Sequence, residues 1–110
     1  MCIRDRIKSA EINEDGDIPI ENIEKEITDK TKVIAITHLS NVTGAVLPIK
    51  EITQLAHSKG IVVVVDGCQG GPHLKLDMQD LDCDFYAISG HKMYGPTGIG
   101  ILYALSLIHI

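Results

Sequence analysis

The chain has 110 residues, of which 45% are hydrophobic and 23% charged, a balance typical of one folded domain and not of a disordered segment. Fifteen acidic residues against ten basic ones give a net charge of −5, so we expect no nucleic-acid partner. No apolar stretch approaches the roughly 20 residues that cross a bilayer, so we expect no membrane contact. The three cysteines lack Cys-x-x-Cys spacing, which predicts no disulfide framework, no metal site and a reducing, cytoplasmic location.

The first half of the chain predicts a helix, a strand and a second helix. Ile20, Ile23 and Ile27 recur at helical spacing and predict a helix over residues 20–29. The β-branched run at residues 32–37 predicts a buried strand, which the polar loop at 40–44 ends. Pro48 suits the first turn of a second helix, and Gly60 stands where a left-handed cap belongs. The apolar stripe of this helix consists of Ile49, Ile52, Leu55 and Ala56.

The second half adds three strands. Residues 61–65 are five β-branched residues in a row, typical of a parallel strand buried on both faces, and they complete a βαβ unit. Residues 84–88 and 99–103 predict further strands, and the glycines and Pro96 between them suit a tight return into an antiparallel strand. We therefore predict an α/β fold, with a mostly parallel sheet, flanking helices and a final antiparallel strand.

Polar residues follow each of the three predicted parallel strands. In an open parallel sheet, ligands bind beyond the carboxyl ends of the strands, because loops and helix N-termini converge there. Asn41 follows the first strand, Asp66 and Gln69 follow the second, and Ser-Gly-His-Lys at residues 89–92 follows the third. We expect these segments to line one crevice.

Asp66 and Lys92 are the two charged residues of this crevice. A carboxylate at the end of an apolar strand needs a donor or a cation, and a helix cap or a structural salt bridge is the ordinary explanation. A lysine at a strand exit is most simply a solvated surface residue, although a partly desolvated lysine is the usual group that binds an aldehyde. Together the two residues form the pair that pyridoxal phosphate requires, a carboxylate for the ring nitrogen and an amine for the aldehyde.

Three stretches carry a resemblance to a known family. They are THLSNVTG at residues 37–44, VVDGCQ at 64–69 and LDCDFYAISGHKMYGPTGIGILY at 81–103. They resemble the class V aminotransferase superfamily of fold type I pyridoxal-phosphate enzymes. Within it they are similar to the cysteine desulfurases of the sulfur-mobilisation type and the related selenocysteine lyases. The resemblance implies that residues 7–103 are the central part of the large cofactor-binding domain of a longer, homodimeric enzyme.

The resemblance also implies which residues contact pyridoxal 5'-phosphate. Lys92 matches the lysine that binds the cofactor aldehyde and, once displaced by the substrate amine, moves the α-proton. Asp66 matches the partner of the pyridine nitrogen, and Gln69 matches the residue that hydrogen-bonds the phenolic oxygen. Ser89 and His91 match contacts to the phosphate.

The resemblance also bears on an asparagine and on the cysteines, and two histidines are interpreted from their place in the chain. Asn41 matches a position near the phenolic oxygen and the substrate carboxylate. Cys68 stands where a small residue such as alanine is usual, which we attribute to packing, and neither Cys68 nor Cys83 aligns with the family's nucleophile. His38, at a strand exit, is either a satisfied structural group or a group that supports the residues of the site, of which we favour the first, and we expect His57 to lie at the surface.

The activity that the resemblance implies is transfer of sulfur from L-cysteine to an enzyme persulfide, with L-alanine as product. The sulfur would pass to an acceptor protein for iron–sulfur cluster assembly, and L-selenocysteine is the corresponding substrate of a lyase. The family's nucleophilic cysteine lies downstream of the matched stretches, so we expect these 110 residues alone to be inactive. Another class V aminotransferase is one alternative. A cofactor-free α/β interaction module, in which Asp66 and Lys92 form only an ion pair, is another.

The two ends of the chain, MCIRDR and LSLIHI, match neither helix nor strand patterns. Both resemble translated sequencing-adapter read-through. We therefore expect residues 1–6 and 105–110 to be non-native and to pack poorly, and we assign no role to Cys2 or His109.

Overall fold

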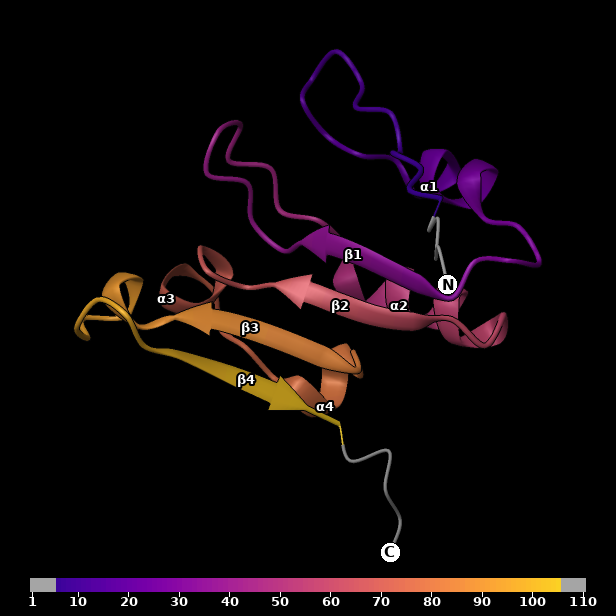
Figure 1. Ribbon diagram of the computed structural model, residues 1–110. Coiled ribbons are helices and arrows are strands. Elements are labelled where there is room, and N and C mark those ends of the chain that lie inside the picture. The colour runs from indigo at the N-terminus through magenta and orange to yellow at the C-terminus, as the bar shows by residue number, and fades with distance from the viewer. Residues whose placement is uncertain (1–5, 106–110) are drawn as a thin grey trace, which may run out of the picture.

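The computed structural model describes residues 6–105 (Figure 1). In this part of the chain the elements follow in the order α1 (Ile20–Glu26), β1 (Val33–Thr37), α2 (Ile49–Ser58), β2 (Val62–Asp66), α3 (Gly70–His73), α4 (Met78–Leu81), β3 (Phe85–Ser89), the 3-10 turn η1 (Gly90–Lys92) and β4 (Gly100–Ala104). None of the helices described is long and apolar enough to cross a membrane.

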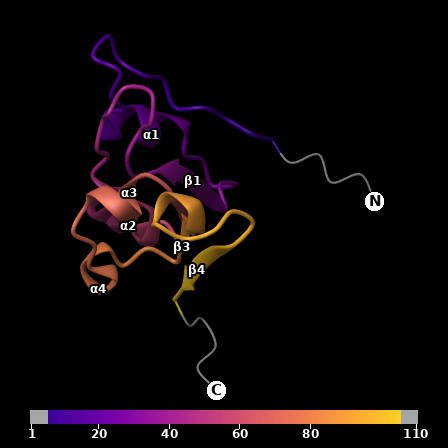
Figure 2. The ribbon, with the colours of Figure 1, turned by 90° about the vertical axis from the view of Figure 1, so that its left-hand side faces the viewer.

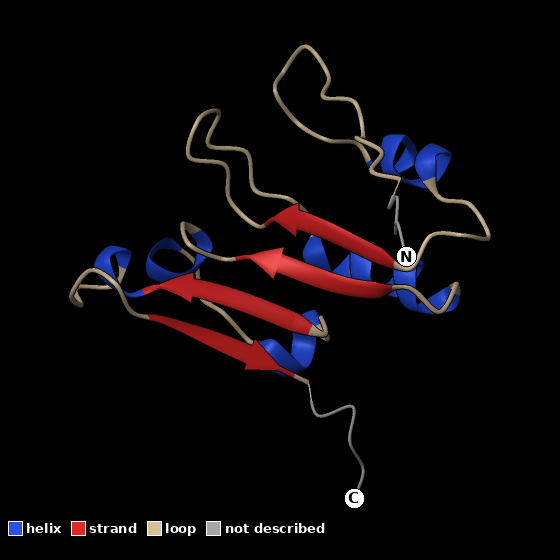
Figure 3. Ribbon diagram, in the orientation of Figure 1, coloured by secondary structure: helices blue, strands red, loops and turns tan. Residues whose placement is uncertain are grey.

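The strands form one sheet in the order β1-β2-β3-β4. β1, β2 and β3 are parallel, and β4 runs antiparallel to β3, as the arrows of Figure 3 show. Thr37 pairs with Asp66, and Asp66 pairs with Ala87, so the carboxyl ends of the three parallel strands lie at one edge. The predicted α/β fold with a final antiparallel strand is confirmed.

Several element boundaries differ from those predicted. The first helix ends at Glu26 rather than at residue 29, because Ile27 is extended and the Thr28 amide donates to Thr31 Oγ1 at 2.9 Å instead of continuing the helical ladder. The last three strands begin and end one residue later than predicted. At β2 the cause is local, since the Ile61 amide donates to Ala56 O and closes the end of α2.

The core lies between the sheet and the helices on one of its faces. Figure 1 shows α2 and α4 behind the sheet. The buried cluster consists of Ile23, Leu47, Ile49, Ile52, Ala56, Ile61, Val63, Val65, Cys83 and Tyr86. On the strands, side chains alternate between faces, so residues such as Val33 and Ala35 point to the opposite, uncovered face.

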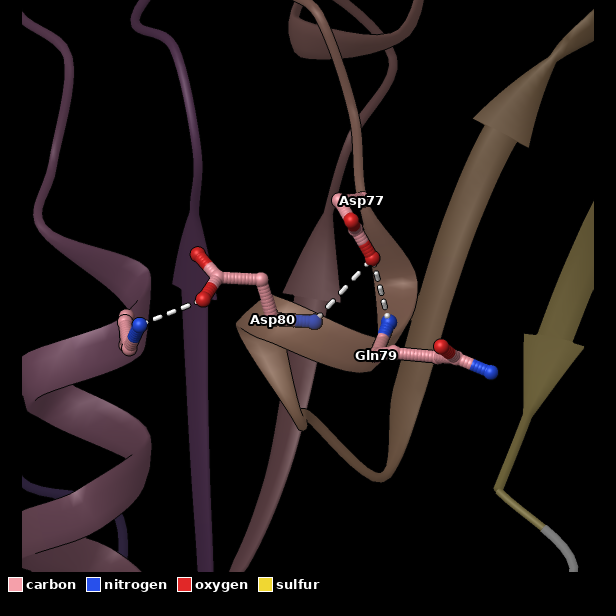
Figure 4. Close-up of polar contacts among 4 residues, drawn as sticks. Asp77, Gln79 and Asp80 are labelled. Carbon is pink, nitrogen blue, oxygen red and sulfur yellow. Dashed lines mark hydrogen bonds and ion pairs between the residues drawn. The ribbon is translucent and has the colours of Figure 1, made fainter.

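The short helix α4 is fixed by polar contacts, which Figure 4 shows. Asp77 Oδ1 accepts hydrogen bonds from the Gln79 and Asp80 amides at 3.0 and 3.1 Å, an N-cap that satisfies donors without an intrahelical partner. Asp80 also forms an ion pair with Lys50 of α2. The sequence did not predict α3 or α4, because four-residue helices are too short to show a periodic pattern.

The expectation that the two ends pack poorly falls mostly outside the described residues, which exclude 1–5 and 106–110. Within them, Arg6 is exposed and the Leu105 amide donates to Asp84 O at 2.8 Å.

Candidate functional site

The candidate site lies at the edge of the sheet where β1, β2 and β3 end. Figure 2 looks onto this side of the molecule and shows α3, which follows β2, next to the turn that follows β3. Figure 1 shows the same neighbourhood from the front. The residues predicted from the sequence all lie on these strand ends or on the segments that directly follow them.

Asp66 is the last residue of β2, and its carboxylate is exposed. The Cys68 amide donates to Asp66 Oδ1 at 2.9 Å. Hydrogen bonding by the Cys68 amide, and then by its side chain, is the main cause that lowers the pKa of Asp66; burial opposes it, and the positive charge of Lys92 adds a smaller lowering. Asp66 is therefore ionised at neutral pH and able to pair with a cation.

Cys68 is half-buried in the turn that follows β2, and its packing role stays a prediction. The Asp66 side chain, followed by desolvation, raises the pKa of the Cys68 thiol. The backbone of Ser89 and the charge of Lys92 act in the opposite direction on the same pKa. These residues lie at or after the ends of β2 and β3, two strands that are paired in the sheet.

Lys92, Ser89 and His91 come from β3 and the turn η1. Ser89 is the last residue of β3 rather than a loop residue, and its Oγ lies 2.7 Å from His91 Nδ1. Lys92 ends η1 and is half-buried. The two residues predicted to contact a phosphate are therefore adjacent, and they hydrogen-bond each other.

Gln69 and Asn41 occupy the two remaining predicted positions. Gln69 is the N-cap residue of α3 and is half-buried, while Asn41 is exposed in the loop after β1. Both lie after carboxyl ends of parallel strands. Their contact with a common ligand stays a prediction.

An open groove of about 340 Å³ runs along the uncovered face of the sheet to this edge. It is lined by Ala35, Ile36, Thr37, Val64, Val65, Asp66 and Ala87. The floor is apolar apart from Thr37 and Asp66.

Two histidines can now be placed. His38, directly after β1, is 7% exposed, and its Nδ1 lies 2.9 Å from Tyr86 Oη, so it is a satisfied buried group as expected. His57 lies partly at the surface, with 32% of its side chain exposed, but it also has a partner that the sequence did not predict. Its Nε2 lies 3.0 Å from Oδ2 of the buried Asp84, because the last turn of α2 passes the start of β3. The sequence missed this pair because its members are 27 residues apart.

Within residues 6–105 no group of three or more His, Cys, Asp or Glu side chains is arranged to hold a metal ion. The site is instead a carboxylate, a lysine and several hydrogen-bonding side chains at the carboxyl edge of a parallel sheet. The fold is therefore α/β, and the candidate ligand site lies at its strand ends. Residues 4–108 match the aminotransferase class-V family, and the chain belongs to that family.

Named relatives narrow the comparison. The chain is 56% identical over 92 residues to a protein from Halalkalibacterium halodurans named "Probable cysteine desulfurase", a match that covers 84% of this chain and 23% of the relative. It is 47% identical over 106 residues to a cysteine desulfurase from Cronobacter sakazakii, with 94% and 26% covered. The crystal structure of the cysteine desulfurase CsdA from Escherichia coli matches with a TM-score of 0.81 and 45% identity, over 86% of this chain and 24% of that one. The chain thus spans about a quarter of the length of these relatives.

Proposed function

We propose that this chain is part of a pyridoxal-5'-phosphate-dependent cysteine desulfurase. The observation that carries the proposal is the placement of the two charges: Asp66 ends β2, and Lys92 ends the turn that directly follows β3, the strand paired with β2. Membership of the aminotransferase class-V family and relatives named cysteine desulfurase support the choice of reaction.

The residues at this edge fit the chemistry of the cofactor. An exposed carboxylate that stays ionised is the partner that a protonated pyridine nitrogen needs, and the two form a charge-assisted hydrogen bond. When bound, pyridoxal phosphate supplies an electron sink for bonds at the substrate α-carbon. The apolar floor of the groove beside Asp66 offers a surface for a planar ring.

Each remaining residue has one task in this proposal. Lys92 holds the cofactor aldehyde, and after the substrate amine has taken its place, the free lysine amine moves the α-proton. Gln69 hydrogen-bonds the phenolic oxygen. Ser89 and His91, which hydrogen-bond each other in this structure, contact the phosphate. Asn41 lies toward the substrate carboxylate.

The sulfur transfer needs a thiol that these residues do not supply. In the reaction the C–S bond of L-cysteine breaks, a protein thiol takes the sulfur and becomes a persulfide, and the carbon skeleton leaves as L-alanine. Cys83 is fully buried, and the contact with Asp66 raises the pKa of the Cys68 thiol and keeps it protonated. We therefore assign the nucleophile to neither cysteine, but to another part of the longer protein.

The same family membership suggests the setting of the reaction. We propose a cytoplasmic homodimer that passes its sulfur to an acceptor protein for iron–sulfur cluster assembly. L-Selenocysteine is the competing substrate, because a selenocysteine lyase would use the same residues. Comparing turnover of the two amino acids by one enzyme preparation decides between them.

The test grafts residues 7–103 into the 56% identical Halalkalibacterium halodurans protein in place of the matching segment; we call this the grafted protein. It should be yellow and release alanine from L-cysteine. Lys92→Ala should abolish turnover. Asp66→Asn should retain part of the cofactor and lower the rate at least about tenfold, because each 1.4 kcal/mol of lost transition-state stabilisation costs that factor.

A matched control uses Lys59→Ala, which removes an exposed lysine at the C-terminus of α2, where the strands begin rather than end. It should leave turnover unchanged. Normal turnover in Lys92→Ala, or a folded grafted protein that binds no pyridoxal phosphate, would contradict the proposal. The cofactor-free interaction module would then be the better account.

A further inference from the structure

A buried hydrogen-bonded pair lies beneath the segment that carries Asp66. Tyr86 of β3 is 0% exposed, and His38 at the end of β1 is 7% exposed. Tyr86 Oη and His38 Nδ1 are 2.9 Å apart, and the two rings meet edge to face, with centroids 5.8 Å apart and an interplanar angle of 87°. The pair links β1 to β3 across β2, the strand that ends in Asp66.

The turn that follows Asp66 rests directly on this pair. A Cβ atom added at Gly67 would lie 1.8 Å from Tyr86 Cε1, so the backbone of the turn at Gly67 packs directly against the Tyr86 ring. A Cβ atom added at Gly70 would lie 2.6 Å from Tyr86 Oη and 3.2 Å from His38 Nδ1. The glycines at both ends of the turn are therefore required by close approach to Tyr86 and His38.

Backbone hydrogen bonds fix the same turn from its sides. The His38 amide donates to Asp66 O at 2.9 Å, and the Gly67 amide donates to Ala87 O at 2.8 Å. The Gly71 amide donates back to Gly67 O at 2.7 Å. Since the Cys68 amide also donates to Asp66 Oδ1, the position of the Asp66 carboxylate depends on where this turn lies.

We propose that His38 and Tyr86 are positioning residues. They support the turn of residues 66–70 from below and so fix the orientation of Asp66 and Gln69 toward the cofactor ring. This inference rests on the proposed function. Neither residue touches the cofactor in this account. They act through Gly67 and Gly70.

Both members of the pair are neutral at physiological pH. Burial lowers the pKa of His38, and burial raises the pKa of Tyr86 to about 12. The pair therefore adds a directional hydrogen bond beneath the turn without placing a net charge next to Asp66. Removal of the Tyr86 hydroxyl leaves His38 Nδ1 without this partner in a buried place, so the imidazole or the turn must shift.

Alkylation of Cys68 reports the position of the turn without any cofactor. The Asp66 carboxylate is the main cause that raises the pKa of the Cys68 thiol, and the backbone of Ser89 and the charge of Lys92 oppose it. If the turn moves, this effect of Asp66 weakens, and the thiolate fraction at a given pH rises. The experiment measures the iodoacetamide rate of Cys68 against pH by peptide mapping in the cofactor-free grafted protein, with the buried Cys83 as an internal reference.

Tyr86→Phe keeps the ring beneath Gly67 and removes only the hydroxyl. It should raise the alkylation rate of Cys68 at about pH 8 at least twofold and shift the profile to lower pH. In the loaded grafted protein it should weaken cofactor binding by about fivefold, the equivalent of one hydrogen bond of ~1 kcal/mol. His38→Gln keeps a side-chain amide for the hydroxyl and should show a smaller change of the same sign.

The control is Ile52→Val, which shortens a fully buried side chain of α2 and costs stability by a similar amount. A purely structural role predicts that all three variants lower the unfolding midpoint alike and leave the Cys68 profile unchanged, which would overturn the inference. If Tyr86→Phe does not fold, His38→Gln decides by the same measurement.

If the unmodified grafted protein binds no pyridoxal phosphate, the proposed function fails and the positioning role toward the ring fails with it. The Cys68 profile still shows whether the pair holds the turn.

Discussion

Replacing Asp84 should destabilise the fold strongly, at the end of the sheet opposite the site. Asp84 is 5% exposed, and its Oδ2 accepts hydrogen bonds from the Val63 amide at 2.7 Å and from His57 Nε2 at 3.0 Å. Asp84→Leu leaves the buried Val63 donor unsatisfied, which costs about 1–3 kcal/mol, and removes a second bond worth about 1 kcal/mol. The total of about 2–4 kcal/mol is a large share of the ~5–15 kcal/mol that stabilises a typical domain.

The assay is urea unfolding of the 110-residue chain, followed by circular dichroism. With a slope of about 2 kcal/mol per molar urea, the middle of the usual range for small proteins, Asp84→Leu should lower the midpoint by about 1–2 M. Asp84→Asn keeps an oxygen for the Val63 amide and should cost about 1 kcal/mol. The control is Asp82→Asn, two residues away, where the side chain is 64% exposed and φ is 53°, a conformation that asparagine tolerates. Equal losses for Asp84→Asn and Asp84→Leu would refute the reasoning, because the retained acceptor would then have no value.

Three further predictions concern other parts of the chain. Gly67→Ala should cost about 3 kcal/mol or more, because its Cβ would overlap the Tyr86 ring; Gly60→Ala, at φ +69° with nothing within 4 Å, should cost only about 1–2 kcal/mol in the same urea assay. Burial lowers the pKa of His38, so below about pH 6.5 the unfolded chain binds more protons than the folded chain. The stability that is present above that pH is therefore lost as the pH falls. Urea midpoints at about pH 7.5 and 5.5 should show this loss, and His38→Gln should reduce it, whereas an unchanged loss would exclude His38 as its source. Asp77→Ala removes the N-cap of α4 and should cost about 1 kcal/mol, and protection of the Gln79 and Asp80 amides from hydrogen exchange should fall with it; unchanged protection would contradict the capping role (Figure 4).

The elements that the sequence predicted well are those with strong periodicity. The β-branched run of β2 predicts a strand that is buried in a parallel sheet, and the amphipathic stripe of α2 predicts a helix with one buried face. Gly60 adopts the expected left-handed conformation at φ +69°. The single-residue shifts of the later strands follow from bonds at their ends, such as that from the Ile61 amide to Ala56 O, which no local pattern announces.

The candidate site was predictable in its location but not in its internal contacts. Parallel strands bring their carboxyl ends together, so the order of strands and loops was enough to place Asp66 and Lys92 at one edge. The bond from the Cys68 amide to Asp66 is local to the turn, whereas the pair formed by His38 and Tyr86 depends on how side chains pack across strands. His38 and Tyr86 are 48 residues apart, and composition or spacing carries no signal for such a contact.

Reduction of the loaded grafted protein with borohydride, followed by digestion and mass spectrometry, identifies the lysine that binds the cofactor. If Lys92 holds the cofactor aldehyde, the reduced adduct should be found on the peptide that contains Ser89 to Tyr94, with Lys92 itself as the modified residue. Lys92→Ala should carry no adduct, while Lys59→Ala should carry it in full. An adduct on a different lysine, or the same adduct in Lys92→Ala, would contradict the assignment of this edge of the sheet as the cofactor site.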